Sequence, residues 1–252
     1  MKLLFSFMFL ALAIGCAKLA APKTSAQKYN DAADSAKIEY VDVDLTSKLT
    51  LGKWFCRDGD GTTSYTIGIA YSYLNYDTPE QFVDKLNKSS IANQTNWSEY
   101  RKMKPNGRNF DDLTSFEDPD KGFAGTNCSG LVSRSLKAGG FKVTPTLGMA
   151  LWTAPGGPLT LVGTTGLKKG YVVFFFRDDG TGPDPEWVHT GIVYVPNTAS
   201  NYSTVVHCVA LSAFNFQASE NSILAVLQAF DKWENNASIT YSYRAYKISG
   251  ED

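Results

Sequence analysis

The feature that most constrains the fold is a succession of strand-like runs in the second half of the chain. "GYVVFFFRD" (170–178) is a nearly continuous apolar run, typical of a buried strand. "HTGIVYV" (189–195), "YSTVVHCVAL" (202–211) and "ITYSYRAYKI" (239–248) are rich in β-branched and aromatic residues and are separated by turns. "SILAVLQAFDKWENN" (222–236) has apolar residues at helical spacing. The sequence therefore predicts an antiparallel sheet in an α+β domain.

A short helix is predicted just before these strands, in "GTNCSGLVSRSLKAGGF" (125–141). Asn127 or Thr126 serves as its N-cap, an apolar face follows, and a Gly-Gly pair ends it. Cys128 then lies in the first turn, where the helix dipole and free backbone N–H groups lower the pKa of a thiol. The same N–H groups can form an oxyanion hole. The alternative is a buried structural cysteine.

The chain has two histidines, and both lie in predicted strands after Cys128. A turn centred on 196–200 sets His189 directly opposite His207 on one face, although a slip of one residue would separate them. Strand alternation turns Cys208 away from that face, as a core or disulfide residue. We expect His189 to act as general base and acid for Cys128, with His207 holding its ring by a hydrogen bond.

Four segments resemble motifs of the NlpC/P60 family of papain-like cysteine peptidases, in the family's order. They are "NCSGLV" (127–132), "KKGYVVFF" (168–175), "HTGIVY" (189–194) and "VVHCV" (205–209). The resemblance implies a papain-like fold with the cysteine helix packed on an antiparallel sheet. It also implies attack by Cys128 on a peptide carbonyl, an acyl-enzyme, and a triad completed by His189 and His207. The family's usual substrates are the stem peptides of bacterial peptidoglycan, and no cofactor is implied.

The resemblance also suggests residues that bind substrate. Ser129 matches the family's serine, and Tyr100 is the nearest counterpart of a lead-in tyrosine. Asn127 replaces the family's usual aspartate, which puts recognition of a free L-alanine amine in doubt. Trp187 precedes His189 by two residues, so we expect it to share that face and to wall the cleft, with a packed aromatic as the alternative.

The N-terminus has the layout of an export signal. Lys2 precedes an apolar run from Leu3 to Ile14, which is shorter than the about 20 residues that span a bilayer. "AIGC" (13–16) resembles a bacterial lipobox, in which Cys16 would be lipidated; ordinary cleavage after Ala17 is the alternative. Either way we expect an exported protein: an outer-membrane or cell-surface lipoprotein, or a secreted protein.

Three regions are predicted along the 252 residues. Residues 1–16 form the signal, 17–110 a tether and accessory region, and 111–252 the catalytic domain. "DTPEQFVDKLNKSS" (77–90) predicts a helix that starts near Pro79. The net charge of −1, with 24 basic and 25 acidic residues and no long run of either sign, argues against nucleic acid as a partner. We expect a monomer that contacts a membrane only through a lipid anchor.

Other classes of function remain as alternatives. A CHAP-type amidase shares the layout, but its triad usually ends in Asn, Asp or Glu, unlike His207. Lecithin-retinol-type acyltransferases place the histidine before the cysteine. A non-catalytic module would hold peptidoglycan peptides without cutting them. The cysteines and histidines lack the spacing of a zinc site, so no metal is expected. Export would allow Cys56 and Cys208 to pair.

Overall fold

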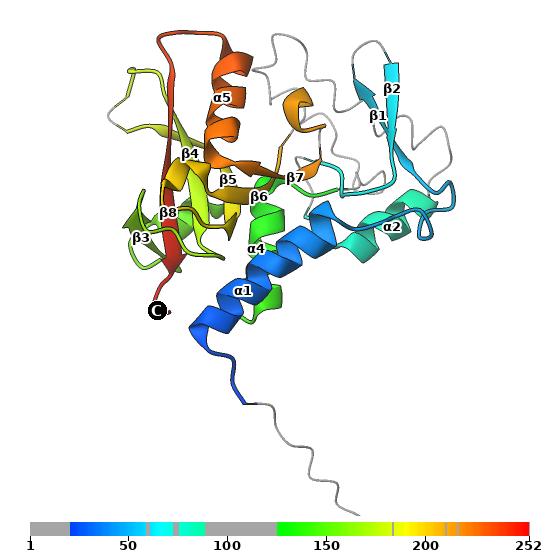
Figure 1. Cartoon of the computed structure of the whole chain (residues 1–252), viewed down its shortest axis with the longest axis horizontal. Coiled ribbons are helices and arrows are strands. Elements are labelled where there is room, and N and C mark those ends of the chain that lie inside the picture. Colours follow the sequence, from blue (N-terminus) through cyan, green and yellow to red (C-terminus); the bar gives the residue numbers. More distant parts are fainter. Residues whose placement is uncertain are drawn as a thin grey trace, which may run out of the picture.

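The computed structural model describes residues 21–58, 61–72, 76–88, 125–182, 184–209, 211–215 and 217–251. Within them, a two-stranded hairpin accompanies a six-stranded antiparallel sheet flanked by helices (Figure 1). The helices include α1 (Ser25–Ser35), α2 (Pro79–Lys88), α4 (Cys128–Gly139) and α5 (Ile223–Glu234). The strands are β1 (Trp54–Asp58), β2 (Gly61–Tyr65), β3 (Leu159–Gly163), β4 (Val172–Asp178), β5 (Glu186–Val195), β6 (Thr204–Cys208), β7 (Ala218–Ser222) and β8 (Thr240–Ile248). The predicted α+β class and antiparallel sheet are confirmed.

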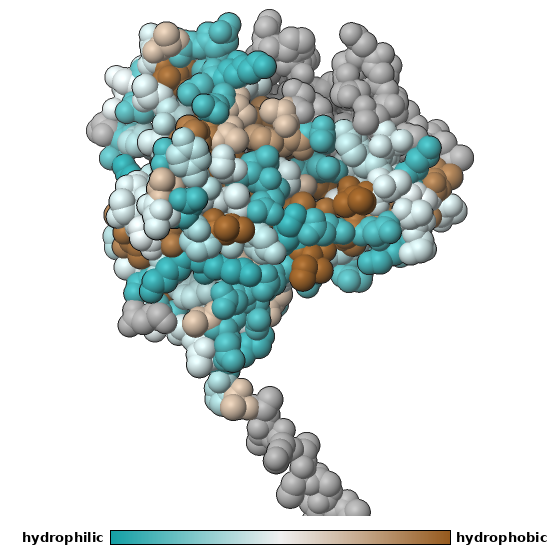
Figure 2. Space-filling model, viewed as in Figure 1, coloured by the Kyte–Doolittle hydropathy of each residue, from teal (hydrophilic) through white to brown (hydrophobic). Residues whose placement is uncertain are grey.

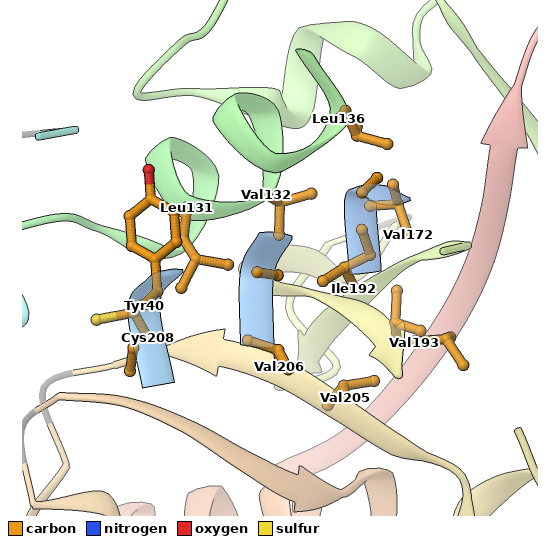
Figure 3. Packing of buried hydrophobic residues seen from close by; sticks show 14 of the residues in the cluster. Tyr40, Leu131, Val132, Leu136, Val172, Ile192, Val193, Val205, Val206 and Cys208 are labelled. Atoms are coloured by element: carbon orange, nitrogen blue, oxygen red, sulfur yellow. The ribbon is translucent and has the colours of Figure 1, made fainter. Parts of the chain in front are cut away.

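The six-stranded sheet has the order β3-β8-β4-β5-β6-β7. Helix α4 covers one face, and α5 lies against the other (Figure 1). Figure 3 shows apolar side chains of α4 pointing at the sheet, and the full burial of Leu131, Val132 and Leu136 agrees with this view. Each such side chain stabilises the fold by about 1.5–3 kcal/mol relative to exposure. The face of α4 that the sequence predicted as apolar therefore attaches the helix to the sheet.

The inner strands of the sheet were predicted from the sequence, whereas the two edge strands were not. Strands β4, β5, β6 and β8 lie at or near the predicted runs, although β5 begins three residues earlier, at Glu186. Strand β7 has the sequence "ASENS" and β3 has "LTLVG", and neither was predicted. Both lie at the edges of the sheet. An edge strand has only one partner strand, so it needs no long apolar run.

The predicted helices at 77–90, 125–141 and 222–236 are all present as α2, α4 and α5. Thr78 caps α2: its hydroxyl accepts from the Gln81 N–H at 3.2 Å, and its own N–H donates to the Gln81 side chain at 2.9 Å. Asn127 caps α4, and Ser222 caps α5. Local capping signals in the sequence therefore fixed where these helices begin.

Helix α1 lies inside the region predicted to begin as a tether. Thr24 and Gln27 form a capping box at its start, and buried residues of α1 pack against α4. The contact is close: a Cβ on Gly139 would lie 2.8 Å from Ala32 Cβ and would also meet Lys28 O. Ordered structure thus begins by Ser25, earlier than the composition suggested. The division at 110 and 111 lies outside the described residues and stays a prediction.

Hydrophobic and hydrophilic residues alternate over the face seen in Figure 2, with hydrophobic residues gathered between α1 and α2. The exposed apolar side chains include Ile38, which follows α1. None of the helices in the described part of the chain is long and apolar enough to cross a membrane. The predicted export segment and Cys16 lie outside the described residues.

Candidate active site

The first turn of α4 is built around its cap, Asn127. Its side-chain oxygen accepts from the Gly130 N–H at 2.6 Å, and its amide nitrogen donates to Leu147 O at 3.2 Å. The cap therefore engages Gly130 and leaves the N–H groups of Cys128 and Ser129 outside the helical ladder. Both the side-chain oxygen and the side-chain nitrogen of Asn127 thus bond to the chain itself. The role of Asn127 in binding substrate stays a prediction.

The residues just before α4 are held by the N-terminal half of the chain. The Thr126 N–H donates to Ala70 O, and Thr126 O accepts from the Ser72 N–H, both at 3.0 Å. The Gly125 N–H donates to Asp77 Oδ2 at 3.0 Å, and Gly125 O accepts from the Asp77 N–H at 3.1 Å. The entry to the cysteine helix is thus fixed from two sides.

Tyr76 packs directly on the first turn of α4. A Cβ on Gly130 would meet Tyr76 Cβ and lie 2.8 Å from Thr126 Oγ1, so only glycine fits there. Arg134, one turn further along, donates to Tyr76 O and lies 4.9 Å from the centre of its ring. These contacts give the glycine of "NCSG" a steric reason.

A second segment, which leads into the helical turn Met149–Thr153, is tied to α4. The hydroxyl of Ser129 accepts from the Met149 N–H at 3.3 Å. The hydroxyl of Ser133 accepts from the Thr146 N–H at 3.0 Å. Ser129 is fully buried, so the structure gives it a positioning contact, and its predicted contact with substrate stays a prediction.

Cys128 is half-buried at the start of α4. Burial raises the pKa of its thiol, whereas the N–H groups of Thr190, Ser129 and Cys128 itself act in the opposite direction. The backbone N–H groups at the helix start therefore lower the thiol pKa as predicted. The predicted net lowering is nevertheless wrong, because the effect of burial is larger. The sulfur carries its proton at neutral pH.

The two histidines meet, although strands β5 and β6 pair two residues away from the predicted register. Gly191, not His189, lies opposite His207, because a helical turn at Ser200–Tyr202 makes the connection longer than the assumed turn at 196–200. A shift of two residues keeps each side chain on its face. His189 Nε2 lies 3.0 Å from His207 Nδ1. The predicted shared face and hydrogen bond are confirmed.

Both imidazoles are buried among aromatic rings. His189 is 1% exposed and contacts Phe175 and Phe230, and His207 is 0% exposed and contacts Phe214. Burial lowers the pKa of His189 well below its ordinary value, and neighbouring His207 lowers it further. Burial lowers the pKa of His207 to about 4. Both rings are therefore neutral at pH 7.

Strand β7 supplies a polar group that the sequence analysis did not identify. Asn221 Oδ1 lies 3.1 Å from His207 Nε2, and Ser219 Oγ lies 3.4 Å from the same nitrogen. Ser219 pairs with His207 across the ladder, and Asn221 follows two residues later on the same face. The only sequence signal is the alternation in "ASENS", which has meaning only once the strand and its register are known.

The thiol and the histidine pair reach β5 from different sides. Helix α4 covers one face of the sheet, whereas His189 contacts Phe230 of α5 on the other face, and its hydrogen-bonded partner His207 lies on that face too. The Cys128 sulfur nevertheless lies beside the N–H of Thr190, the residue next to His189. The pairing of β5 with β6 begins at Gly191, so the thiol reaches β5 at Thr190, just outside that ladder. In the described residues no hydrogen bond joins Cys128 to His189.

Trp187 does not share the face of His189. His189 pairs with Phe175 and Trp187 pairs with Phe176, so one extra residue between them forms a β-bulge. The Trp187 ring contacts Phe174, on the face that carries α4. The predicted shared face is wrong because the bulge interrupts the alternation. The predicted role of Trp187 in walling the cleft and binding substrate stays a prediction.

The other predicted residues are placed as follows. Cys208 points toward α4 (Figure 3), and its S–H donates to Thr126 O at 3.3 Å, which confirms its orientation away from the histidines. The side chain of Cys56 and the whole of Tyr100 lie outside the described residues. In the part of the chain that the structure describes, no cluster of three or more His, Cys, Asp or Glu side chains is arranged to hold a metal.

Comparisons with known proteins identify no relative of this chain. No family model matches the chain. A search of curated proteins also finds no match.

Proposed function

We propose that this chain is an exported, papain-like cysteine hydrolase, similar to the NlpC/P60 family, that cleaves amide bonds in peptidoglycan stem peptides. One observation carries the proposal. The thiol that starts α4 lies beside the N–H of Thr190, and the preceding residue, His189, is hydrogen-bonded through Nε2 to His207. This bond leaves Nδ1 of His189 as the ring nitrogen for the thiol, and catalytic contacts often tighten only when substrate binds.

The proposed reaction uses the thiol as nucleophile. The Cys128 proton moves to His189 Nδ1 while sulfur attacks the peptide carbonyl, and the N–H groups at the start of α4 stabilise the oxyanion. His189 then gives the proton to the leaving nitrogen, and the C–N bond breaks to leave a thioester. Water attacks the thioester, His189 takes its proton and returns it to sulfur, and the carboxylic acid product leaves.

The neutral resting state determines how this reaction starts. The pKa of the thiol is raised and those of both imidazoles are lowered, so a thiol and a neutral ring face the substrate. Proton transfer then accompanies attack and does not precede it. His207 stabilises the imidazolium that forms on His189, because its Nδ1 accepts the Nε2–H bond.

The second candidate is a non-catalytic module that holds the same peptides. The buried histidines and the absence, among the described residues, of a Cys128–His189 hydrogen bond favour it. A CHAP-like amidase would use the same chemistry on a different bond. In each case the protein acts outside the cytoplasm, either anchored through a lipid on Cys16 or secreted.

The test compares three forms of the chain without residues 1–16: wild type, Cys128→Ala and the thiol control Cys208→Ala. Each is incubated with isolated peptidoglycan and with defined stem peptides, and products are identified by mass spectrometry. We expect new peptide termini with wild type and Cys208→Ala but not with Cys128→Ala. The cleaved bond distinguishes an endopeptidase from an amidase. Equal binding by all three forms without any cleavage would instead support the non-catalytic module.

A further inference from the structure

We infer that Asn221 is a positioning residue whose amide oxygen fixes the proton on Nε2 of His207 and, through that ring, leaves Nδ1 of His189 free to accept the thiol proton. The catalytic part of this inference rests on the proposed function. The positions of the two ring protons do not, because they are properties of the folded protein alone.

The argument follows three groups in a row. Asn221 Oδ1 lies 3.1 Å from His207 Nε2, and His207 Nδ1 lies 3.0 Å from His189 Nε2. A neutral imidazole has one N–H and one bare nitrogen, and an amide oxygen only accepts. His207 therefore donates from Nε2 and accepts at Nδ1. His189 must then donate from Nε2, which leaves its Nδ1 bare.

The opposite arrangement would disable the proposed base. If His207 Nε2 were bare, it would accept a bond from the Ser219 hydroxyl, and its Nδ1–H would donate to His189 Nε2. His189 would then carry its proton on Nδ1 and have no lone pair for the thiol. Asn221 Oδ1 is the nearer partner of this nitrogen, at 3.1 Å against 3.4 Å for Ser219 Oγ. The choice between the two arrangements is thus made at β7.

The described surroundings of the pair contain no other group that selects between the arrangements. Phe175 on β4 and Phe230 on α5 face His189, and Phe214 faces His207. Glu220, the residue between the two polar side chains of β7, contacts Thr204 and Lys37 instead. Both rings are buried and neutral, so a single polar contact at one end determines the protonation along the row.

The experiment uses the fact that the chain contains only two histidines. The protein without residues 1–16, carrying no histidine tag, is labelled with ¹⁵N-histidine, and long-range ¹H–¹⁵N spectra are recorded at pH 7. For wild type we expect both rings to be protonated on Nε2 and bare on Nδ1. A proton on Nδ1 of either ring would overturn the inference, whether or not the protein hydrolyses anything.

Three variants separate positioning from packing. Asn221→Leu should populate Nδ1–H forms of the rings and lower kcat at least about tenfold, with KM little changed. Asn221→Asp keeps an acceptor, so it should retain the wild-type ring protons and most of kcat at pH 7. Its carboxylate should also raise the pKa of His207 and move the acid limb of the pH profile upward. The matched control Ser219→Ala should resemble wild type in both measurements.

The outcomes are separable. Wild-type ring protons and wild-type kcat in Asn221→Leu would refute a positioning role. A loss of kcat in Asn221→Asp equal to that in Asn221→Leu, with ring protons unchanged in both, would also refute it. Ring protons that follow the expected pattern in a wild type that cleaves no peptide would refute the proposed function and leave the assignment of Asn221 intact. If Asn221→Leu does not fold, the wild-type spectrum still decides the ring protons.

Discussion

At the scale of single residues, the thiol of Cys128 differs from that of a preformed thiolate–imidazolium pair. Burial raises its pKa, and the neighbouring N–H groups offset only part of this. We expect the rate of alkylation by iodoacetamide to be low at pH 6–7 and to rise with pH beyond pH 9, because only the thiolate reacts. Rates are measured by intact mass, and Cys128→Ala corrects for the other cysteines. A rate that is already at its plateau near pH 6 would contradict this expectation.

The buried histidines should make the fold sensitive to acid. His207 has a folded-state pKa of about 4, against about 6.5 when unfolded, so the unfolded chain binds the extra proton between these values. Its contribution to stability is present above pH 6.5 and is lost as the pH falls. From pH 7 to pH 5 we expect this histidine alone to cost about 2 kcal/mol of unfolding free energy. Urea unfolding at the two pH values measures the loss.

The control for this prediction is the double variant His189→Asn, His207→Asn, which cannot titrate at these positions. Its unfolding free energy should change less between pH 7 and pH 5 than that of wild type. An equal change in both proteins would assign the acid sensitivity to other groups.

The sequence was informative about which residues are candidates for the chemistry and less informative about the environment of each side chain. Cys128 and the two histidines follow from residue type, order and motif. The net shift of the Cys128 pKa could not be predicted in this way, because it depends on burial by segments that are distant in the sequence. Asn221 was missed because an asparagine in a short polar stretch has no local signature until its strand is paired. Trp187 was misplaced by a single bulge.

At the scale of elements, the contact between α1 and α4 depends on Gly139. Alanine in an open helix would gain up to about 1 kcal/mol over glycine. Here the added Cβ would meet the Lys28 carbonyl oxygen and lie 2.8 Å from Ala32 Cβ, and overpacking costs about 1–3 kcal/mol. We expect Gly139→Ala to lower the unfolding free energy by about 1–2 kcal/mol. Lys137→Ala, on the exposed side of the same turn, should change it little; a stabilised Gly139→Ala would show that the helices can separate freely.

The elements themselves illustrate what sequence patterns can fix. Helices α2, α4 and α5 each carry a local cap and an apolar face, and buried strands such as β4 have continuous apolar runs, so all were predicted. The register of β5 and β6 was not, because it depends on a connection that contains its own helical turn. The error of two residues preserved the faces, which is why the histidine pair was still predicted correctly.

At the scale of the whole molecule, the N-terminal half is bound to the entry of the cysteine helix. Ala70 and Asp77 hydrogen-bond to Thr126 and Gly125, and α1 packs on α4. We therefore expect residues 111–252 alone to lack a cooperative thermal unfolding transition by circular dichroism. Residues 21–252 should show one. A folded, thermally cooperative fragment 111–252 would demonstrate that these contacts are dispensable.

The early start of α1 also limits how far the folded part of the chain can lie from a lipid attached to Cys16. In the lipoprotein form of the proposal, nine residue steps separate Cys16 from Ser25, the first residue of α1, which packs on α4. A fully extended chain covers at most about 3.3–3.6 Å per residue, so the segment from Cys16 to Ser25 can span at most about 30 Å. The folded part of the chain would then begin within this distance of the bilayer. Under the proposed function, the anchored form could reach only those cell-wall peptides that lie close to the membrane surface, unlike a freely diffusing secreted form.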